Sequence, residues 1–227
     1  MDSLYDTLLG LPLFAGISQQ KFLETVGKHK FHFLKYEPGA TIVREGDNCT
    51  HMKSIINGSV RMTTNSPDGK FRISQTLTAP DIISPDFFFG RTTKYPADAK
   101  AIDTVGILQF DKNDFMKIIN SDEIFLLNYL NILSMNAQLA PQGVLALTSG
   151  ALEKRIAYWL IALTQTNGTD IELECRQKDM YAAFGVQRQS LLSALDRLQS
   201  SNIISFTTNS ISVLDRRMLM EILMQQP

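Results

Sequence analysis

The polar residues whose types and spacing could do chemistry on a large partner gather around residue 188. The stretch 179–204 predicts two short amphipathic helices joined by a tight turn at Gly185-Val186, because glycine takes the backbone angles of such a turn without a Cβ clash. The first turn of the second helix would then offer donors and acceptors of the kind that enter a DNA major groove. These side chains are Gln187, Arg188, Gln189 and Ser190. A helical hairpin that only packs against its neighbours is the alternative reading.

Each candidate side chain has an expected role at a DNA surface. Arg188 can bond O6 and N7 of a guanine, and Gln189 can bond N6 and N7 of an adenine. Gln187, Ser190 and Lys178 are expected to contact phosphates, which position a helix without reading the base sequence.

Apolar residues at helical spacing must hold these side chains in place. The first helix is expected to pack through Met180, Ala183 and Phe184. The second helix is expected to pack through a face with spacings of three and four, made of Leu191, Leu192, Leu195 and Leu198. Two strands, 203–206 and 211–213, should pair across Asn209-Ser210 as a wing, followed by a last helix over 216–224.

Composition excludes several classes of protein. The chain has 227 residues, of which 44% are hydrophobic and 20% charged, as expected of a soluble globular protein of one large or two ordinary domains. No apolar run is long enough to span a membrane, and Asp2 and Asp6 replace the basic start of a signal peptide, so we expect a cytoplasmic protein with no membrane partner. The net charge of −1 gives no general attraction to nucleic acid.

The inventory of reactive side chains argues against an enzyme or a metal protein. Cys49 and Cys175 lie far apart, which predicts a reducing compartment and no disulfide framework. Three histidines, His29, His32 and His51, form no ligand set, and no catalytic triad or phosphate loop is present. A redox-sensitive thiol at Cys49 is a less favoured alternative.

The hydrophobic period changes to two after Phe31, which predicts short strands of an antiparallel sandwich or barrel. The strand candidates are 31–36, 41–45, 51–56, 59–64, 71–77 and 104–110. Asn57-Gly58 and Asp68-Gly69 between them predict type I′ hairpin turns.

Three turn-containing motifs in this region resemble a known family. They are Pro38-Gly39-Ala40-Thr41-Ile42, Glu45-Gly46-Asp47 and Ile55-Ile56-Asn57-Gly58-Ser59-Val60. In order and spacing the chain resembles the cyclic-AMP receptor protein/FNR (Crp/Fnr) family of bacterial transcription regulators from about Leu11 to Met218. The resemblance implies an α+β fold: a cyclic-nucleotide-binding-like jelly-roll β-barrel, a long dimerisation helix and a C-terminal winged helix-turn-helix. The expected domains are 1–120 for effector sensing, 121–148 for dimerisation and hinge, and 149–227 for DNA binding.

The same resemblance implies a homodimeric, sequence-specific transcription regulator controlled by an effector sensed in the barrel. Its partners would be a pseudo-palindromic double-stranded operator, a second copy of itself and RNA polymerase. Better-known members carry Arg-Glu and, after three more residues, Arg in the recognition helix. Here Arg188-Gln189 is followed by Ser193, so only the first position is kept and the usual half-site is not expected. The alternative is a sensing or interaction protein of this fold that has lost DNA binding.

The family's cyclic-nucleotide site is poorly preserved. Ser84-Pro85 stands where the resemblance implies Gly-Glu, Tyr95-Pro96 where it implies Arg-Ser, and Ala140-Pro141 where it implies Thr-Ser. A buried phosphate needs a cation or several N–H donors, so we do not expect cyclic AMP as the effector, although Arg91 and Lys94 are nearby cations. The candidate effector pocket is Ile83, Ser84, Phe87, Phe88, Arg91, Tyr95 and Ala140.

The cofactor stays open at this point. No cysteine precedes Cys49, which excludes the N-terminal iron–sulfur cluster of FNR-type members on ligand count. Phe87, Phe88 and Phe89 are expected mainly to pack the barrel against the long helix. A planar apolar ligand such as haem would also suit such a wall.

The longest predicted helix, 122–147, carries two apolar stripes. A heptad seam typical of a two-stranded coiled coil consists of Leu126, Leu130, Leu133, Ala137, Ala140, Val144 and Leu147. A second stripe suited to packing on the barrel consists of Phe125, Tyr129, Ile132 and Leu139. Two stripes imply two partners, and hence a homodimer. Pro141 predicts a kink or a break, and Thr148–Gly150 a hinge in which Ser149 caps the next helix.

Overall fold

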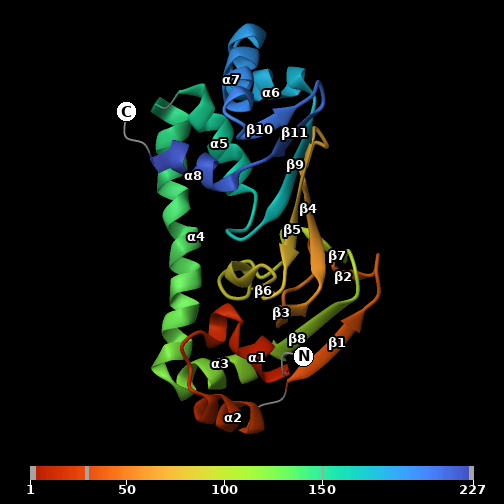
Figure 1. Cartoon of the computed structure of the whole chain (residues 1–227), viewed down its shortest axis with the longest axis vertical. Helices are drawn as coiled ribbons and strands as arrows, with labels where there is room; N and C mark the ends of the chain where they lie inside the picture. Colours follow the sequence, from red (N-terminus) through yellow and green to blue (C-terminus); the bar gives the residue numbers. More distant parts are fainter. Residues whose placement is uncertain (1–3, 29–30, 150, 225–227) are drawn as a thin grey trace. The chain divides into compact units, whose positions relative to one another are not determined.

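The computed structural model describes residues 4–28, 31–149 and 151–224 (Figure 1). Contacts divide the chain into two compact units. The first comprises Met1–Met62 and Leu77–Ala137, and the second comprises Thr63–Thr76 and Gln138–Pro227. The chain therefore passes from one unit to the other three times.

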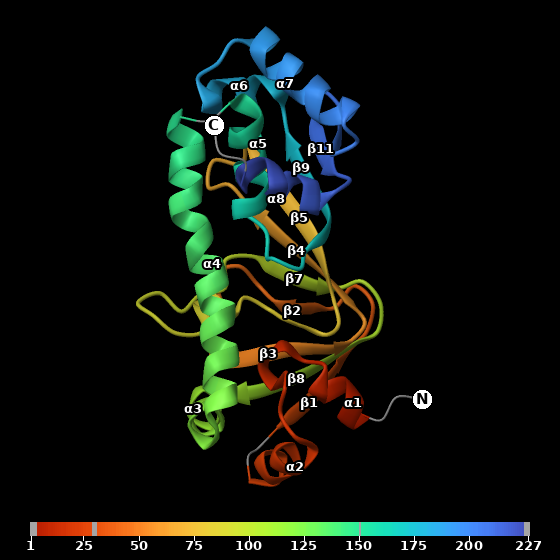
Figure 2. The same cartoon turned by 60° about the vertical axis from the view of Figure 1, so that its left-hand side comes forward.

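The first unit begins with helices and continues as two layers of strands. The helices are α1 (Leu4–Leu9), the short 3₁₀ helix η1 (Pro12–Phe14) and α2 (Gln19–Lys28). One antiparallel sheet has the order β1-β8-β3-β6, with bounds His32–Tyr36, Val105–Asp111, His51–Asn57 and Asp81–Ile82. Figure 2 shows β1, β8 and β3 side by side. The other layer contains β2 (Thr41–Val43), β7 (Asp98–Ala101) and the start of β4 (Ser59–Asn65).

The core of the first unit lies between these layers and the adjoining helices. Burial alternates in the first half of β3, as the period of two predicts, but residues 54–56 of β3 and residues 107–108 of β8 are buried in succession. Helix α3 (Lys112–Ser121) begins where Asp111 accepts a hydrogen bond from the Asp114 N–H at 2.8 Å. Fully buried side chains of this core include Phe14, Phe88, Phe110, Phe115, Phe125, Leu11, Leu13, Met52, Ile55, Leu77 and Ile82. The jelly-roll barrel expected from the sequence is confirmed.

The turn at Asn57-Gly58 is not a type I′ hairpin, so that prediction is wrong. It joins β3 of one sheet to β4 of the other, and only Gly58 has a positive φ, of 80°. A Cβ on Gly58 would meet the Asp103 side chain at 2.5 Å and the Thr104 carbonyl at 2.6 Å. Glycine is needed here because the chain turns a corner of the sandwich against another strand connection.

The turn at Asp68-Gly69 does close a hairpin, but its type also differs from the prediction. The Gly69 N–H donates to the Ser66 carbonyl at 2.9 Å, so Pro67 and Asp68 are the central residues. Proline fixes a negative φ, and only Gly69 has a positive one, of 67°. The hairpin therefore uses a four-residue turn that starts one step earlier than the dipeptide suggests.

The second unit combines the tip of this hairpin with the C-terminal part of the chain. Its sheet has the order β10-β11-β9-β5-β4, in which β5 spans Phe71–Thr78 and β9 spans Thr169–Cys175. Its helices are α5 (Leu152–Ala162), α6 (Gln177–Phe184), α7 (Arg188–Ser200) and α8 (Arg216–Met224). The predicted wing is confirmed, since β10 (Ile204–Phe206) pairs antiparallel with β11 (Ser210–Val213). The sequence did not indicate β9.

Helix α4 runs from Glu123 to Ser149 without interruption. Of the kink or break predicted at Pro141, the break is wrong, because the residues on both sides of this proline are helical; the kink stays a prediction. Ser149 is the last residue of α4 and not the cap of α5, whose N-cap is Ala151 without a side-chain cap bond. The first two residues of the predicted hinge, Thr148 and Ser149, are thus helical, and the third, Gly150, lies outside the described residues.

Candidate DNA-binding interface and effector region

The turn between α6 and α7 is closed by backbone hydrogen bonds around Gly185. Gly185 has a φ of 63°, a left-handed conformation that residues with a Cβ rarely adopt. Its N–H donates to the Ala182 carbonyl at 3.2 Å, and the Val186 N–H donates to the Tyr181 carbonyl at 3.0 Å. This is the usual glycine closure of a helix C-terminus, and it confirms the turn predicted at Gly185-Val186.

The predicted packing faces hold except at Ala183 and, in part, at Leu192. Met180 and Phe184 of α6 are buried, and α7 buries Leu191, Ala194, Leu195 and Leu198. Leu192 is half-buried. Ala183 was expected to pack but is exposed, because it lines an open cleft beside Asp68 and Lys70 of the hairpin.

Helix α5 fixes both helices of the motif from behind. The Arg155 guanidinium donates through Nη2 to the Phe184 carbonyl at 2.6 Å and lies 5.3 Å from the centre of the Phe184 ring. The Trp159 ring meets the Phe184 ring edge to face, with centroids 5.4 Å apart. An ion pair joins Arg197 of α7 to Glu153 of α5. No sequence spacing predicts these supporting contacts, because the partners lie on separate helices.

All six predicted DNA-contacting side chains are exposed: Lys178, Gln187, Arg188, Gln189, Ser190 and Ser193. Gln187 is the N-cap of α7, and Arg188 is its first residue. Gln189 and Ser193 follow each other by one helical turn, away from the buried face. The N-terminus of a helix also carries a partial positive charge that favours phosphate. The structure therefore brings five of the six onto the start of α7, while Lys178 lies in the first turn of α6.

The predicted effector region is filled by aromatic packing. Phe88 is 0% exposed, and its ring lies 5.3 Å from Phe115 of α3. Phe89 lies 6.1 Å from Tyr129 of α4, and the Tyr129 hydroxyl donates to the Pro85 carbonyl at 3.2 Å. Phe87 is half-buried at the end of the 3₁₀ helix η2 (Pro85–Phe87). These contacts attach the loop to α3 and α4, as the packing interpretation of the three phenylalanines expected.

The polar side chains predicted for this region are either bonded within the protein or exposed to solvent. Tyr95 is buried, and its hydroxyl donates to the His51 carbonyl at 3.2 Å. Burial raises the pKa of Tyr95 far above its ordinary value, so the phenol stays neutral. Arg91 and Lys94 are exposed. Ile83 and Ser84 are buried, and the side chain of Ala140 lies outside the described residues.

One cation near this loop was not predicted. The Lys112 ammonium, at the start of α3, lies 5.5 Å from the centre of the Phe88 ring and 5.8 Å from that of Phe89. A cation above aromatic faces is attracted by their quadrupoles. Lys112 therefore places a positive charge beside the aromatic cluster of Phe88 and Phe89.

Both cysteines are buried thiols. Cys49 is 2% exposed, and burial raises its pKa. Burial, with a smaller contribution from Asp179, raises the pKa of Cys175 to about 11. A protonated thiol is a poor nucleophile, so neither group has the exposure or ionisation of a redox sensor.

The two stripes of α4 differ in exposure, as far as its side chains are described. Phe125 and Tyr129 are buried in the first unit. Leu126 is 38% exposed and Leu130 is 46% exposed, although both are large and apolar. Leu133 is half-buried and Ala137 is exposed, while the side chain of Val144 lies outside the described residues. Leu127 and Met135, each 55% exposed, widen the apolar surface beyond the predicted seam.

Within the described ranges 4–28, 31–149 and 151–224, none of the helices has the length and hydrophobicity needed to span a bilayer. No group of three His, Cys, Asp or Glu side chains suited to a metal ion occurs among those residues.

Comparison with known proteins matches two domains. Residues 33–122 match the cyclic nucleotide-binding domain, and residues 154–222 match the Crp-like helix-turn-helix domain. The cAMP-activated global transcriptional regulator CRP of Haemophilus influenzae is 22% identical over 82% of this chain and 85% of its own length. The transcriptional activatory protein AadR of Rhodopseudomonas palustris is 21% identical over 88% of this chain and 83% of its own.

The same architecture occurs in a solved structure. The catabolite activator protein of Thermus thermophilus aligns over 93% of this chain and 98% of its own, with a TM-score of 0.52 and 19% identity. The two proteins thus share a fold over most of the chain. The chain belongs to the Crp/Fnr family of transcription regulators and carries its helix-turn-helix DNA-binding domain.

Proposed function

We propose that this protein is a homodimeric regulator that reads a pseudo-palindromic operator through the first turn of α7. The observation that supports this most strongly is the contrast within the motif. Gln187, Arg188 and Gln189 are exposed at the start of α7, while the opposite face is buried and α5 fixes both helices. Arg188 and Gln189 read bases, and Lys178, Gln187 and Ser190 hold phosphates. Ser193 adds a polar group one turn further along.

The proposed dimer forms through α4. Leu126 and Leu130 expose apolar surface that a single chain leaves in water, and they continue the heptad seam seen in the sequence. A two-fold dimer would place two recognition helices on half-sites roughly 34 Å apart.

The dimer can be tested at Leu130. Leu130→Glu places a charge in the seam, and we expect it to weaken association at least about tenfold, because a buried unpaired charge is strongly disfavoured. Met116→Glu, at another exposed apolar position on α3, is the matched control. Sedimentation equilibrium measures both, and a Leu130→Glu variant that dimerises like the parent contradicts the proposal.

The proposed effector is not cyclic AMP. Tyr95 stands where the family has its phosphate-binding arginine. Its hydroxyl donates a hydrogen bond to the His51 carbonyl and carries no charge. Arg91 and Lys94 are exposed, and the Phe88 and Phe89 rings pack against each other and against Phe115. Any signal sensed here therefore acts through an apolar, aromatic-walled region rather than through a phosphate clamp. The relative from H. influenzae is cAMP-activated by name, and we propose that this protein differs from it in its effector.

The proposed mechanism is a shift between two arrangements. A signal in the barrel biases α4 near Ala140-Pro141, and the connection at 148–150 sets the direction of the recognition helices. An effector can do this only by binding one arrangement more tightly than the other. RNA polymerase would be the partner that reads out operator occupancy.

Selection of bound sequences from random double-stranded DNA tests the function. We expect an enriched palindrome with the parent protein, and with Arg188→Ala a weaker enrichment in which one base position of each half-site is no longer specified. Arg217→Ala, which removes an exposed arginine of α8, should enrich the same palindrome as the parent. If the parent enriches nothing, the alternative holds, namely a sensing or interaction protein of this fold that does not bind DNA.

A further inference from the structure

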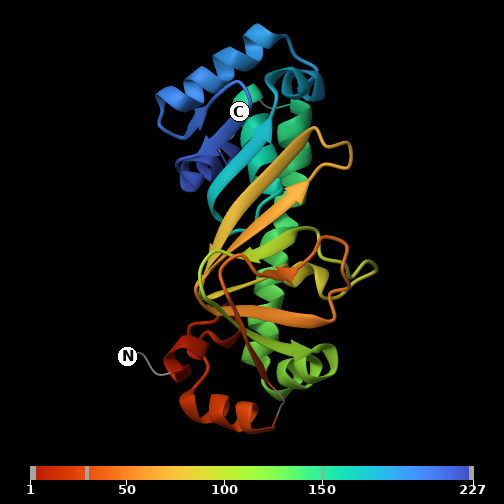
Figure 3. The ribbon, with the colours of Figure 1, turned by 90° about the vertical axis from the view of Figure 1, so that its right-hand side faces the viewer.

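Residues 63–76, the distal part of the β4–β5 hairpin, belong to the DNA-binding unit, although the sequence places them within the barrel. Strand β5 pairs antiparallel with β9, in a register that sets Phe71 opposite Cys175, Arg72 opposite Glu174 and Ile73 opposite Leu173. Figure 3 shows β5 (yellow) beside β9 (teal). Strand β9 is therefore paired on both edges, with β11 on one side and β5 on the other.

Apolar residues of β5 complete the core of that unit. Ile73 is 2% exposed and belongs to the same buried cluster as Leu173 and Leu195. The Phe71 ring meets the Trp159 ring edge to face, with centroids 5.1 Å apart. Trp159 in turn contacts Phe184, at the end of α6. Side chains of the hairpin thus reach the helices that hold the recognition helix.

Polar contacts also join β5 to the segment that leads into β9. Gln75 is 5% exposed, and its Oε1 accepts the Gln165 N–H at 2.8 Å. This oxygen occupies the space that a Cβ on Gly168 would need. The Thr169 hydroxyl donates to the Thr76 carbonyl at 3.3 Å. A buried amide with a matched partner indicates a built interface, because an unmatched one would be costly.

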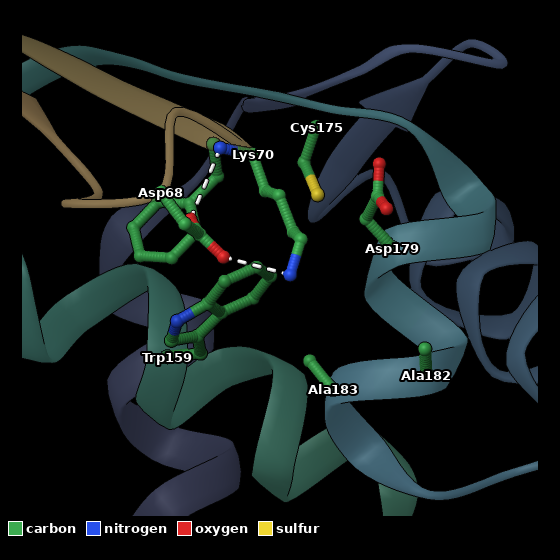
Figure 4. Close-up of a pocket in the computed structure, with 8 residues that line it drawn as sticks. Asp68, Lys70, Trp159, Cys175, Asp179, Ala182 and Ala183 are labelled. Carbon is green, nitrogen blue, oxygen red and sulfur yellow. Dashed lines mark hydrogen bonds and ion pairs between the residues drawn. The ribbon is translucent and has the colours of Figure 1, made fainter.

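The hairpin tip also encloses a cleft of about 290 Å³ with α5 and α6 (Figure 4). The Lys70 ammonium lies 2.8 Å from an Asp68 carboxylate oxygen, within this cleft. Trp159, Asp179 and Ala183 line its other sides.

We propose that residues 63–76 are an integral part of the DNA-binding unit, and that operator binding requires this hairpin to stay docked on β9. The requirement for operator binding rests on the function proposed above. The chain enters the hairpin from the barrel at Met62–Thr63 and leaves it at Thr76–Leu77. The hairpin is therefore a covalent connection between the two units, in addition to the one within α4 at Ala137–Gln138.

The register supplies a way to lock the hairpin. The Cys175 N–H donates to the Asn209 carbonyl, the Phe71 N–H donates to the Ser66 hydroxyl, and the Phe71 carbonyl accepts the Ser66 N–H, which is the pattern of a non-hydrogen-bonded pair between β5 and β9. Such a pair in an antiparallel sheet brings Cα atoms to about 4.5 Å, within the range that a disulfide spans. Phe71→Cys therefore places a thiol opposite Cys175.

The experiment uses full-length protein with Cys49→Ala and Phe71→Cys. Oxidised glutathione accepts two electrons and two protons from the introduced thiol and Cys175, leaving one disulfide in the protein and two reduced glutathione molecules. Mildly alkaline buffer helps, since the pKa of Cys175 is raised. The control adds Cys175→Ala, which leaves no pair to oxidise. We expect the intramolecular cross-link only in the first protein, with operator affinity within about threefold of the reduced form.

Two results overturn the proposal. One is failure of the cross-link to form in the folded protein, which shows that the hairpin is not docked. The other is a loss of operator affinity of about tenfold or more on cross-linking, which shows that the hairpin must leave β9.

Ile73 gives a second, independent reading. Ile73→Asn should lower operator affinity at least about tenfold, because it buries an unmatched amide, whereas Ile73→Val should keep it within about threefold. An Ile73→Asn protein that is folded and binds like the parent contradicts the proposal. If it does not fold, the cross-link still decides.

Failure of the proposed function has a different signature. If selection enriches no DNA, the requirement for operator binding falls with it. The cross-link and the thermal unfolding of Ile73→Val against Ile73→Asn then report on docking alone.

Discussion

The start of α7 and the loop at residues 83–95 treat their polar groups in opposite ways. At α7 the side chains of Gln187, Arg188 and Gln189 are exposed, and the helix is fixed from its other face by α5. In the loop the Tyr95 hydroxyl is bonded within the protein and Phe88 is fully buried. The first region leaves its polar side chains exposed, so that a partner could contact them. The second region has its aromatic side chains packed and the Tyr95 hydroxyl bonded within the protein. A signal in the barrel is therefore expected to act on packing rather than through a ready-made polar clamp.

The most severe test of this contrast is Phe88→Ala. If the ring is a core element, its loss should lower the free energy of unfolding by about 3–5 kcal/mol. Denaturant unfolding measures this, with Phe33→Ala, at a ring 49% exposed on β1, as the control that should change little. A loss at Phe88 no greater than at Phe33 would show that the loop is open space for a ligand.

The support behind the reading surface can be tested at Arg155. Arg155→Met keeps much of the side-chain volume but removes the bond to the Phe184 carbonyl and the stacking on its ring. We expect a loss of about 1.5–3 kcal/mol of stability, as for a hydrogen bond from a charged donor, together with weaker operator binding. The buried Arg155 Nε has no hydrogen-bond partner in the described structure. This unpaired donor offsets part of the stability that the contacts with Phe184 supply. Equal stability with unchanged operator affinity would mean that α5 does not fix the motif.

The reading surface itself should separate binding from stability. Arg188→Ala is expected to weaken operator binding by about 1–3 kcal/mol through the loss of a guanine contact, and to relax specificity at one base position. Its melting temperature should stay that of the parent, since the side chain contacts solvent. Titration against the selected operator and a thermal scan measure the two quantities. A fall in stability would mean that Arg188 also has a structural role.

The smallest expected effect concerns alkaline pH and the hairpin strand. The pKa of Cys175 rises from 9.0 to about 11 in the folded protein. Between these values the unfolded thiol ionises while the folded one stays protonated, so the unfolded state binds fewer protons and stability falls as pH rises. Cys175→Ala should flatten this part of the curve of unfolding free energy against pH. A curve as steep as that of the parent would assign the dependence to other groups.

Local signals in the sequence were sufficient for much of the fold and for the exposed face of α7. Gly185 marks the turn because few residues can take its φ, and the spacing of Leu191, Leu195 and Leu198 sets which side of α7 is exposed. The wing and α8 followed from alternation and helical period. These features depend on neighbours within about ten residues, which a period can report.

The features that were missed depend on contacts between distant parts of the chain. The period of two identifies β5 as a strand, but not that Ile73 packs against Leu173, a hundred residues later. Asn57-Gly58 has the composition of a hairpin, yet its neighbours in space, Asp103 and Thr104, make it a corner. The Arg155–Phe184 contact joins two separate helices, and no spacing reports such a pair.

The closure of α6 by Gly185 and Arg155 has a consequence for how such a protein diversifies. Neither residue is among the side chains proposed to contact DNA, and those proposed side chains are exposed, so the positions proposed to choose the operator are separate from the contacts that close the motif. Arg188, Gln189 and Ser193 can then be exchanged while the scaffold stays intact. Gene duplication followed by substitution at these three positions would give a new target sequence with the same sensor attached.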